Sequence, residues 1–364
     1  MAPKTGNMQL LRWKSLRILL TDIFVWVLAM VVFVILRFYP TFEIPLLATD
    51  PAIDFDFTMW LGIQAGLFLG VIYGFVDIFL DQQWLRKRSF GSILLIKGII
   101  HLLIIFLVSI EARVEAFDKM GIEITREMMS SSIINPRILI ILLYTTMVSF
   151  ILNFSRQINL KFGPGNLVKF LTGKFHHPKE ELRIFMFLDM KASTTIAENL
   201  GHVKFGELVQ DCFSDLTVVV NRQAEVYQYV GDEAILYWEV KKGLHHCNCL
   251  MAFFDYMKQL KSRESYYLKK YGVCPDFKAG INIGEVTVAE VGDIKRDLAF
   301  LGDTMNTAAR IEGQCNIYNK NLLISEALHD QLPECQFLKR TFVASLELEG
   351  KQQSIGVFSV ELMS

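Results

Sequence analysis

Two acidic residues stand where buried strands are expected to end. Asp189 follows five apolar residues in the stretch "RIFMFLDMKASTT", and Asp232 lies in "GDE" between two apolar stretches. A Gly-Asp pair between such stretches is typical of a hairpin turn. If the strands are neighbours, both carboxylates meet at one edge of a sheet and repel each other unless a cation lies between them. Because Mg²⁺ accepts a carboxylate or two plus phosphate oxygens, the pair predicts a divalent-cation site.

The residues that follow Asp189 predict a phosphate site. "KASTT" begins with Lys191, Ala192, Ser193 and Thr194 and is expected to open a helix. The first turn of a helix presents free backbone N–H groups, which bind anions. A metal beside a phosphate site suggests a nucleoside triphosphate. Two simpler interpretations stay open: an ordinary capped strand-to-helix turn at Asp189, and an ordinary turn residue at Asp232.

A third segment, "LGDTMNTAARIEG" at 301–313, carries Asn306 and Arg310. The two are four residues apart and share one face of a predicted helix. An arginine can donate a fork of hydrogen bonds to phosphate oxygens. The asparagine can orient a sugar oxygen.

These groups need a scaffold of strands and helices to position them. The pattern predicts a strand at 183–189, a helix at about 194–222, two strands around the Gly-Asp turn, a helix at about 243–270, a strand or hairpin at 277–290 and a helix at about 304–317. Because no regular βαβ repeat is present, we expect an α+β sheet with helices on one face.

The first part of the chain is much more apolar than the rest. Hydrophobic residues make up 52% of the sequence and charged residues 21%, and the apolar excess lies before residue 155. Runs of about 20 apolar residues can cross a bilayer. A signal peptide is disfavoured for the first run, which is long and lacks a small-residue cleavage site. Four spans are predicted: Ile18 to Leu36, Met59 to Leu80, Ser92 to Ile110 and Ile138 to Phe154.

We therefore predict three parts: a membrane domain at 1–154, a cytoplasmic connector or coupling element at 155–181 and a catalytic domain at 182–364. Basic residues precede the first run, lie between the second and third and follow the fourth. This places both termini in the cytoplasm, with the spans among the lipids of the cell (inner) membrane. All six cysteines lie in the second half without a disulfide-like spacing, which suggests a reducing compartment. The net charge of −1 and the lack of a nucleic-acid motif argue against nucleic acid as a partner.

Charged residues inside the apolar runs raise a separate question. Asp22, Asp77 and Lys97 fall at similar depth from the cytoplasmic face. A functional role is the default interpretation of such charges. The simpler one is an ion pair that locks the bundle, with Lys97 reaching to the interface. We interpret His101, which has no second histidine for haem ligation in this half, as a packed or hydrogen-bonded residue.

The segments "FLDMKAST", "YQYVGDEAILYW" and "GDTMNTAARIE", in this order, resemble the catalytic domain of the class III adenylyl/guanylyl cyclases. The resemblance covers about residue 183 to the C-terminus. It implies a ferredoxin-like core that works as a homodimer. Asp189 and Asp232, helped by the backbone carbonyl of Met190, would bind two Mg²⁺ or Mn²⁺ ions. Asn306 and Arg310 would come from the other subunit. The ribose 3′-hydroxyl would attack the α-phosphorus and release pyrophosphate.

Two departures from the family pattern concern the nucleotide. The two base-reading positions hold Gln228 and Ala299. A glutamine can both donate and accept hydrogen bonds, so neither base is excluded. ATP is predicted, because the glutamate expected of a guanine reader is absent; GTP remains the alternative. Near the C-terminus, Glu349 stands where the family has a triphosphate-binding basic residue, and Lys351 is the candidate replacement.

Two other functions are less consistent with the sequence. A diguanylate cyclase has a related core, but its Gly-Gly-acid-Glu-Phe signature is missing, since the hairpin reads "YVGDEAI". A catalytically silent membrane sensor with a degenerate cyclase domain is disfavoured, because both acids, the asparagine and the arginine are present. We therefore predict an active, membrane-bound nucleotidyl cyclase, an adenylate cyclase by preference.

Overall fold

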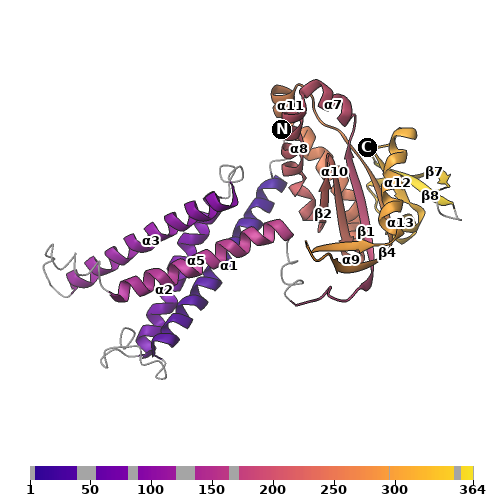
Figure 1. Cartoon of the computed structure of the whole chain (residues 1–364). Coiled ribbons are helices and arrows are strands. Elements are labelled where there is room, and N and C mark those ends of the chain that lie inside the picture. The colour runs from indigo at the N-terminus through magenta and orange to yellow at the C-terminus, as the bar shows by residue number, and fades with distance from the viewer. Residues whose placement is uncertain are drawn as a thin grey trace. The chain divides into compact units, whose positions relative to one another are not determined.

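The chain divides into two compact units, Met1–Lys161 and Phe162–Ser364, each described here by itself (Figure 1). The computed structural model describes residues 5–38, 55–80, 89–119, 136–163, 172–294, 296–347 and 354–363. Lys351 and Glu349 lie outside these residues, as does most of the first external loop.

The N-terminal unit is built from long helices. They are α1 (Thr5–Phe38), α2 (Phe55–Leu80), α3 (Phe90–Lys119) and α5 (Pro136–Phe162). Among the described residues, three segments are long and apolar enough to cross a membrane: Ile18–Arg37, Phe55–Phe79 and Leu139–Asn159. The third predicted run is shorter, since the apolar part of α3 covers Gly91–Leu107 and the helix then continues into the charged sequence "EARVEAFDK". Three of the four predicted spans are therefore long and apolar enough to cross a membrane, and the fourth is not confirmed.

Glycines on α2 bring it against α1. A Cβ atom on Gly66 would lie 2.6 Å from the Cα atom of Val27, and one on Gly70 would lie 2.5 Å from the Cα atom of Ile23. Any larger residue would push the two backbones apart. This close approach through small residues every fourth position is a common way for apolar helices to associate without a hydrophobic driving force between them.

The charged residues inside this unit form one buried network. Lys97 Nζ lies 3.0 Å from Asp77 Oδ1, and the guanidinium of Arg156 contacts both Asp77 and Asp22. The predicted ion pair is confirmed, but Lys97 is only 2% exposed and does not reach outward. The reason is that Asp77 neutralises it inside the bundle. Arg156 joins the network because α5 continues beyond the apolar run, although its position in the sequence indicated only one of the basic residues that follow the fourth run.

His101 is packed and hydrogen-bonded, as predicted. Its Nδ1 atom lies 2.5 Å from the hydroxyl oxygen of Ser149, and its ring lies 3.9 Å from the ring of Tyr73. These contacts join α3 to α5 and α2.

The second unit contains one mixed sheet with the strand order β2-β3-β1-β4-β6-β8-β7, and β5 pairs with β4 (Figure 1). Only β4 and β6 are parallel among the paired strands. The strands are β1 (Lys179–Met190), β2 (Glu225–Val230), β3 (Glu233–Glu239), β4 (Phe277–Val291), β5 (Asp297–Leu301), β6 (Leu322–Ser325), β7 (Leu338–Leu346) and β8 (Ile355–Leu362).

The helices of this unit are shorter than the sequence predicted. They are α7 (Ser193–Leu200), α8 (His202–Asp215), α9 (Val240–Leu244), α10 (Asn248–Ser262), α11 (Glu264–Tyr271), α12 (Asp303–Ile317) and α13 (Glu326–Gln331), with 3₁₀ turns η1 (Leu216–Arg222) and η2 (His245–Cys247). The helix expected at 194–222 breaks at Gly201, whose φ of 74° is left-handed. The helix expected at 243–270 breaks at His246 and Cys247, which also have positive φ.

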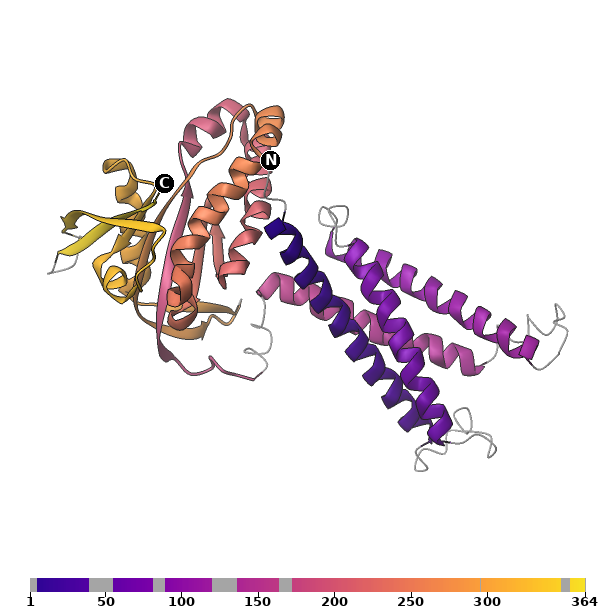
Figure 2. The same ribbon diagram turned by 180° about the vertical axis from the view of Figure 1, so that it is seen from behind.

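Helices cover both faces of the sheet, so the expectation of helices on one face was wrong (Figures 1 and 2). Ile184, Met186 and Leu188 of β1 pack in one core with residues of α8 and α10. Phe185 and Phe187 alternate with them and pack in a second core that includes Ala308 of α12. The unbroken apolar run of β1 is the pattern of a strand buried on both sides.

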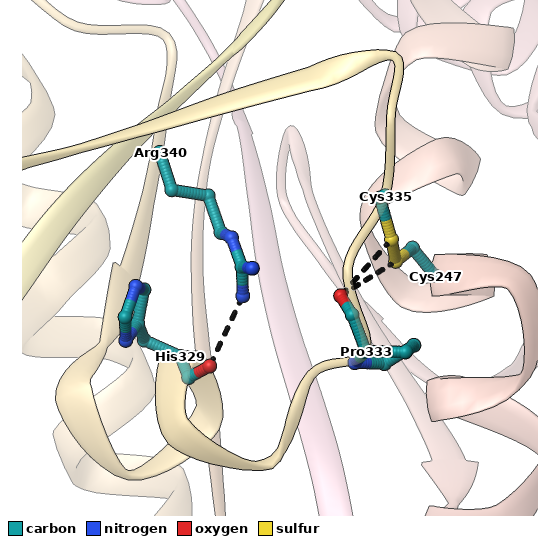
Figure 3. Close-up of a disulfide and its surroundings, with 5 residues drawn as sticks. All are labelled: Cys247, His329, Pro333, Cys335 and Arg340. Carbon is teal, nitrogen blue, oxygen red and sulfur yellow. Dashed lines mark hydrogen bonds between the residues drawn. A yellow bond between two sulfur atoms is a disulfide. The ribbon is translucent and has the colours of Figure 1, made fainter.

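Cys247 and Cys335 form a disulfide (Figure 3), although the spacing of the cysteines does not suggest a disulfide framework. Their Cα atoms are 6.7 Å apart although 88 residues separate them in the chain. The bond joins η2 to the segment between α13 and β7. Sequence spacing could not indicate this pair, because tertiary folding alone brings the two cysteines together. Cytoplasmic disulfides are rare. The cysteines therefore do not support a reducing compartment, and the predicted orientation rests on the basic residues.

We predict that protein denatured without reductant reacts with a thiol reagent at the four remaining cysteines, and at all six after reduction. A variant with Cys247→Ser and Cys335→Ser should lose about 2–4 kcal/mol of unfolding free energy, because the cross-link restricts the unfolded chain. Quantitative thiol titration and denaturant unfolding measure both effects. Six reactive thiols in unreduced protein would contradict the disulfide.

Candidate active site

Asp189 and Asp232 lie at the same end of adjacent strands. β1 and β3 are antiparallel partners with Leu188 opposite Ala234, so the next residue of β1 meets the turn before β3. That turn contains only Gly231 and Asp232. Gly231 has a φ of 62°, a conformation that glycine adopts without strain. The hairpin therefore places the Asp232 carboxylate beside the end of β1, as the sequence predicted.

The electrostatics of this pair fit a cation. Burial and then the neighbouring Asp232 carboxylate raise the pKa of Asp189, while Lys278 opposes the rise. Among the described residues, Asp232 Oδ2 is buried and accepts no hydrogen bond. A buried carboxylate oxygen without a donor is costly unless a cation meets it. The two acids therefore fit Mg²⁺ or Mn²⁺.

The donor set is open rather than closed. In the described part of the chain, no three His, Cys, Asp or Glu side chains are grouped as a metal cage. Two carboxylates, together with the backbone carbonyl that the family resemblance assigns to Met190, leave positions for phosphate oxygens and water. Mg²⁺ sites that bind nucleotide phosphates have this composition.

Helix α7 begins directly after β1, with Ser193 as its first residue and Thr194 next. Ala192 precedes it with a left-handed φ of 53°, and no side chain caps the first turn. The N–H groups of this turn are therefore open to an anion. A non-glycine residue in this conformation is often found at functional sites.

Lys191 does not lie open toward that turn. Its Nζ atom is 3.0 Å from Asp276 Oδ2, and it also donates to the side-chain oxygen of Asn321. Its charge is thus largely neutralised. The N–H groups at the start of α7 are therefore better placed to bind a phosphate than the side chain of Lys191 is.

Asn306 and Arg310 lie one turn apart on α12, as predicted. Asn306 is exposed and Arg310 is half-buried, whereas Thr307, Ala308 and Ile311 are buried. The pair therefore lies on the side of α12 that faces away from the sheet. Asp189 and Asp232 lie where β1 ends and β3 begins, whereas Asn306 and Arg310 face away from the sheet.

The predicted base-reading positions lie on β2 and β5, whose neighbouring residues Tyr227 and Phe300 contact each other. Gln228 is exposed on β2, directly after a register shift in the pairing with β3. Ala299 is half-buried on β5. The rings of their neighbours Tyr227 and Phe300 pack edge to face at 5.0 Å.

Three further charged residues near Asp189 were not singled out from the sequence. Lys278 Nζ lies 3.2 Å from Asp189 Oδ2, and Glu312 Oε1 lies 2.5 Å from the same Nζ atom. Glu233 follows the turn and interacts with both acids. Lys278 could have been found from the sequence, because it is a lone cation in the apolar strand "FKAGINIG".

One cavity of about 560 Å³ lies in this unit, with walls from β4, α12 and α13. Of the predicted site residues that the structure describes, none lines this cavity.

Comparison with protein families shows the family of this domain. The model of the adenylate and guanylate cyclase catalytic domain matches residues 176–360, slightly more than half of the 364 residues. The chain belongs to this family. The match includes Asp189, Asp232, Asn306 and Arg310 and ends within β8.

Named relatives agree with the family. Adenylate cyclase 2 of Rhizobium meliloti (strain 1021) is 30% identical over 221 residues, 60% of this chain and 61% of the relative. Adenylate cyclase of Anabaena cylindrica is 25% identical over 185 residues, 48% of this chain and 36% of the relative. The chain thus spans about three fifths of the first relative's length and about one third of the second's.

A solved structure shows the same fold. The structure of a bacterial light-regulated adenylyl cyclase aligns with a TM-score of 0.50 at 19% identity, over 57% of this chain and 61% of that chain. At this identity the likeness concerns the fold alone.

The acids of the cyclase site predict a pH-dependent stability. Burial raises the pKa of Glu233 to about 7 from an ordinary value of 4.5, and the Asp189, Glu312 and Asp232 carboxylates add to the rise. Between these pH values the folded protein keeps a proton that the unfolded chain has released. Stability is therefore present below about pH 4.5 and is lost as the pH rises through about 7.

With a chelator present, the unfolding temperature of the wild type should fall between pH 5 and 8 relative to that of Glu233→Gln. Thermal unfolding of both proteins over this range measures the difference. Parallel curves would show that Glu233 does not carry this charge effect.

Proposed function

We propose that the chain is a membrane-anchored adenylate cyclase that converts ATP to 3′,5′-cyclic AMP and pyrophosphate. The observation that carries the proposal is the half-buried carboxylate pair, in which Asp232 Oδ2 is buried and accepts no hydrogen bond among the described residues. An uncapped helix start follows the same strand. Both named relatives are adenylate cyclases. Together these features support two-metal chemistry on a nucleoside triphosphate.

In this proposal Asp189 and Asp232, with the Met190 carbonyl, hold two Mg²⁺ or Mn²⁺ ions. When bound, the ions neutralise charge on the triphosphate and activate the ribose 3′-hydroxyl. The first-turn N–H groups of α7 bind phosphate oxygens. Arg310 stabilises the charge that develops on the phosphate during the attack. Lys351 is proposed to hold the triphosphate in place of the residue at position 349.

The site is proposed to form between two copies of the chain. Asn306 and Arg310 face away from the sheet on α12, so they are placed to reach the carboxylates of a second subunit. A symmetric dimer would then contain two equivalent sites, because each subunit contributes both halves. A single chain would hold metal but lack the arginine at the phosphate.

The nucleotide is proposed to be ATP. Gln228 can donate to and accept from an adenine edge. The side chain of Ala299 cannot form a hydrogen bond. Gln228 and Ala299 therefore discriminate between adenine and guanine less strictly than a pair with a charged side chain would. Guanylate cyclase activity is the second candidate, and the exposed glutamine is the observation that keeps it open.

The first unit is proposed to be the membrane domain. Three segments are long and apolar enough to span, and α3 is proposed as the fourth span although its apolar part is shorter. We propose the boundaries 1–154, 155–181 and 182–364 for the membrane domain, connector and catalytic domain. The basic flanks favour both termini in the cytoplasm, at the cell (inner) membrane.

Purified protein with Mn²⁺ and ATP should form cyclic AMP, and it should form less cyclic GMP from GTP. Asp189→Ala and Asp232→Ala should each lower the rate at least about 100-fold, since each removes a metal ligand. Chromatographic product analysis with both nucleotides measures this. Asp211→Ala, which changes an acid paired with Lys270 away from the site, is the matched control. Normal activity in either site variant would overturn the two-metal proposal.

Co-expression tests the shared site. Asp232→Ala and Arg310→Ala proteins, each inactive alone, should recover about a quarter of wild-type activity when mixed subunits assemble at random. Half of the dimers are then mixed, and one of the two sites in each mixed dimer is intact. Different affinity tags allow the mixed dimer to be isolated. Isolated mixed dimers without activity would contradict the shared site.

A further inference from the structure

We propose that Lys278 and Glu312 are positioning residues that set the metal affinity of the cyclase site by exchanging one ion pair for another. Before a metal binds, Lys278 forms an ion pair with Asp189. When the metal binds, Lys278 leaves Asp189 and keeps its ion pair with Glu312. This inference rests on the proposed metal site at Asp189 and Asp232.

The lysine has two partners within reach. Lys278 lies directly opposite Asp189 in the pairing of β1 with β4. Its Nζ atom is 3.2 Å from Asp189 Oδ2 and 2.5 Å from Glu312 Oε1. Lys278 is 7% exposed and Glu312 is 8% exposed. The ammonium group therefore bridges two carboxylates, and neither the lysine nor Glu312 has much contact with water.

The position of Glu312 depends on a glycine. A Cβ atom on Gly280 of β4 would lie 2.2 Å from the backbone N of Glu312 and 2.5 Å from the carbonyl O of Ala308. The backbone of α12 therefore touches β4 at this point. This contact places the Glu312 carboxylate beside Lys278, two residues away from Gly280 on the same face of the strand.

The exchange follows from the cost of buried charge. A metal ion at Asp189 and an ammonium group 3.2 Å from the same carboxylate repel each other, so Lys278 competes with the metal. Releasing Lys278 without a partner would leave a buried cation unpaired, which is strongly unfavourable. Glu312 removes this cost, because it already contacts Nζ. Metal binding then requires a small movement of one side chain rather than transfer of the ammonium to water.

The proposal predicts effects of opposite sign. Lys278→Met should tighten Mn²⁺ binding by about tenfold, since it removes the competing cation. Glu312→Gln should weaken binding by about tenfold, because Lys278 then stays on Asp189. In the Lys278→Met background, Glu312→Gln should change the dissociation constant by less than about threefold, since no lysine remains to be held. Simple charge removal without exchange would instead give equal effects in both backgrounds.

The test titrates the full chain in detergent micelles with Mn²⁺ alone and counts free ion by electron paramagnetic resonance. Lys278→Arg keeps the charge and should bind Mn²⁺ within about threefold of wild type. Thermal unfolding of each variant shows whether it is folded, and Lys278→Gln, alone and combined with Glu312→Gln, replaces Lys278→Met if the methionine variant is not. Equal effects of Glu312→Gln in both backgrounds, or tighter binding in Glu312→Gln, would overturn the exchange.

A separate variant distinguishes this inference from the proposed function. If Asp232→Ala leaves Mn²⁺ binding unchanged, the metal site itself is wrong. If Asp232→Ala abolishes binding while the effects at positions 278 and 312 simply add, only the exchange is wrong.

Discussion

The close approach of two carboxylates at the end of a buried strand is the constraint on which the rest of the cyclase domain depends. β1 is buried on both faces up to Leu188, and Asp189 follows directly as a half-buried residue. The tight turn at Gly231 holds Asp232 beside it. Two acids so placed repel each other, and Lys278 neutralises part of their charge. The remaining negative charge is what makes the site fit divalent cations.

The two units use buried acids differently. In the N-terminal unit, Asp22 and Asp77 meet Arg156, and Lys97 also pairs with Asp77, so carboxylates and cations balance within the bundle. In the cyclase domain four acids, Asp189, Asp232, Glu233 and Glu312, lie around the ammonium group of Lys278, so negative charge is in excess. A balanced network favours a structural role, whereas an unbalanced one favours a ligand. Helix α12 serves both sides of the proposed site, because its inner face holds Glu312 and its outer face presents Asn306 and Arg310.

The positions of the candidate site residues on a strand, a turn and a helix could be predicted from the sequence, whereas much of the scaffold could not. Asp189, Asp232 and the Asn306–Arg310 pair could be found because each stands in a short local pattern: a strand end, a two-residue turn and a helical spacing. Helices on both faces could have been inferred from the unbroken apolar run of β1. Lys278, Arg156 and the disulfide of Cys247 with Cys335 depend on contacts between distant segments, which no local pattern contains. The helix break at Gly201 does coincide with a local signal, the glycine itself, whereas the positive φ at His246 and Cys247 has no such signal in the sequence.

The most direct test is a crystal structure of the protein with Mn²⁺ and an ATP analogue that cannot cyclise, with anomalous scattering recorded at the manganese edge. The account predicts two manganese peaks at ligand distance, about 2.0–2.6 Å, from the carboxylates of Asp189 and Asp232. It also predicts that Asn306 and Arg310 of a second subunit face the same nucleotide. Manganese bound elsewhere, or bound through only one of the two carboxylates, would contradict it.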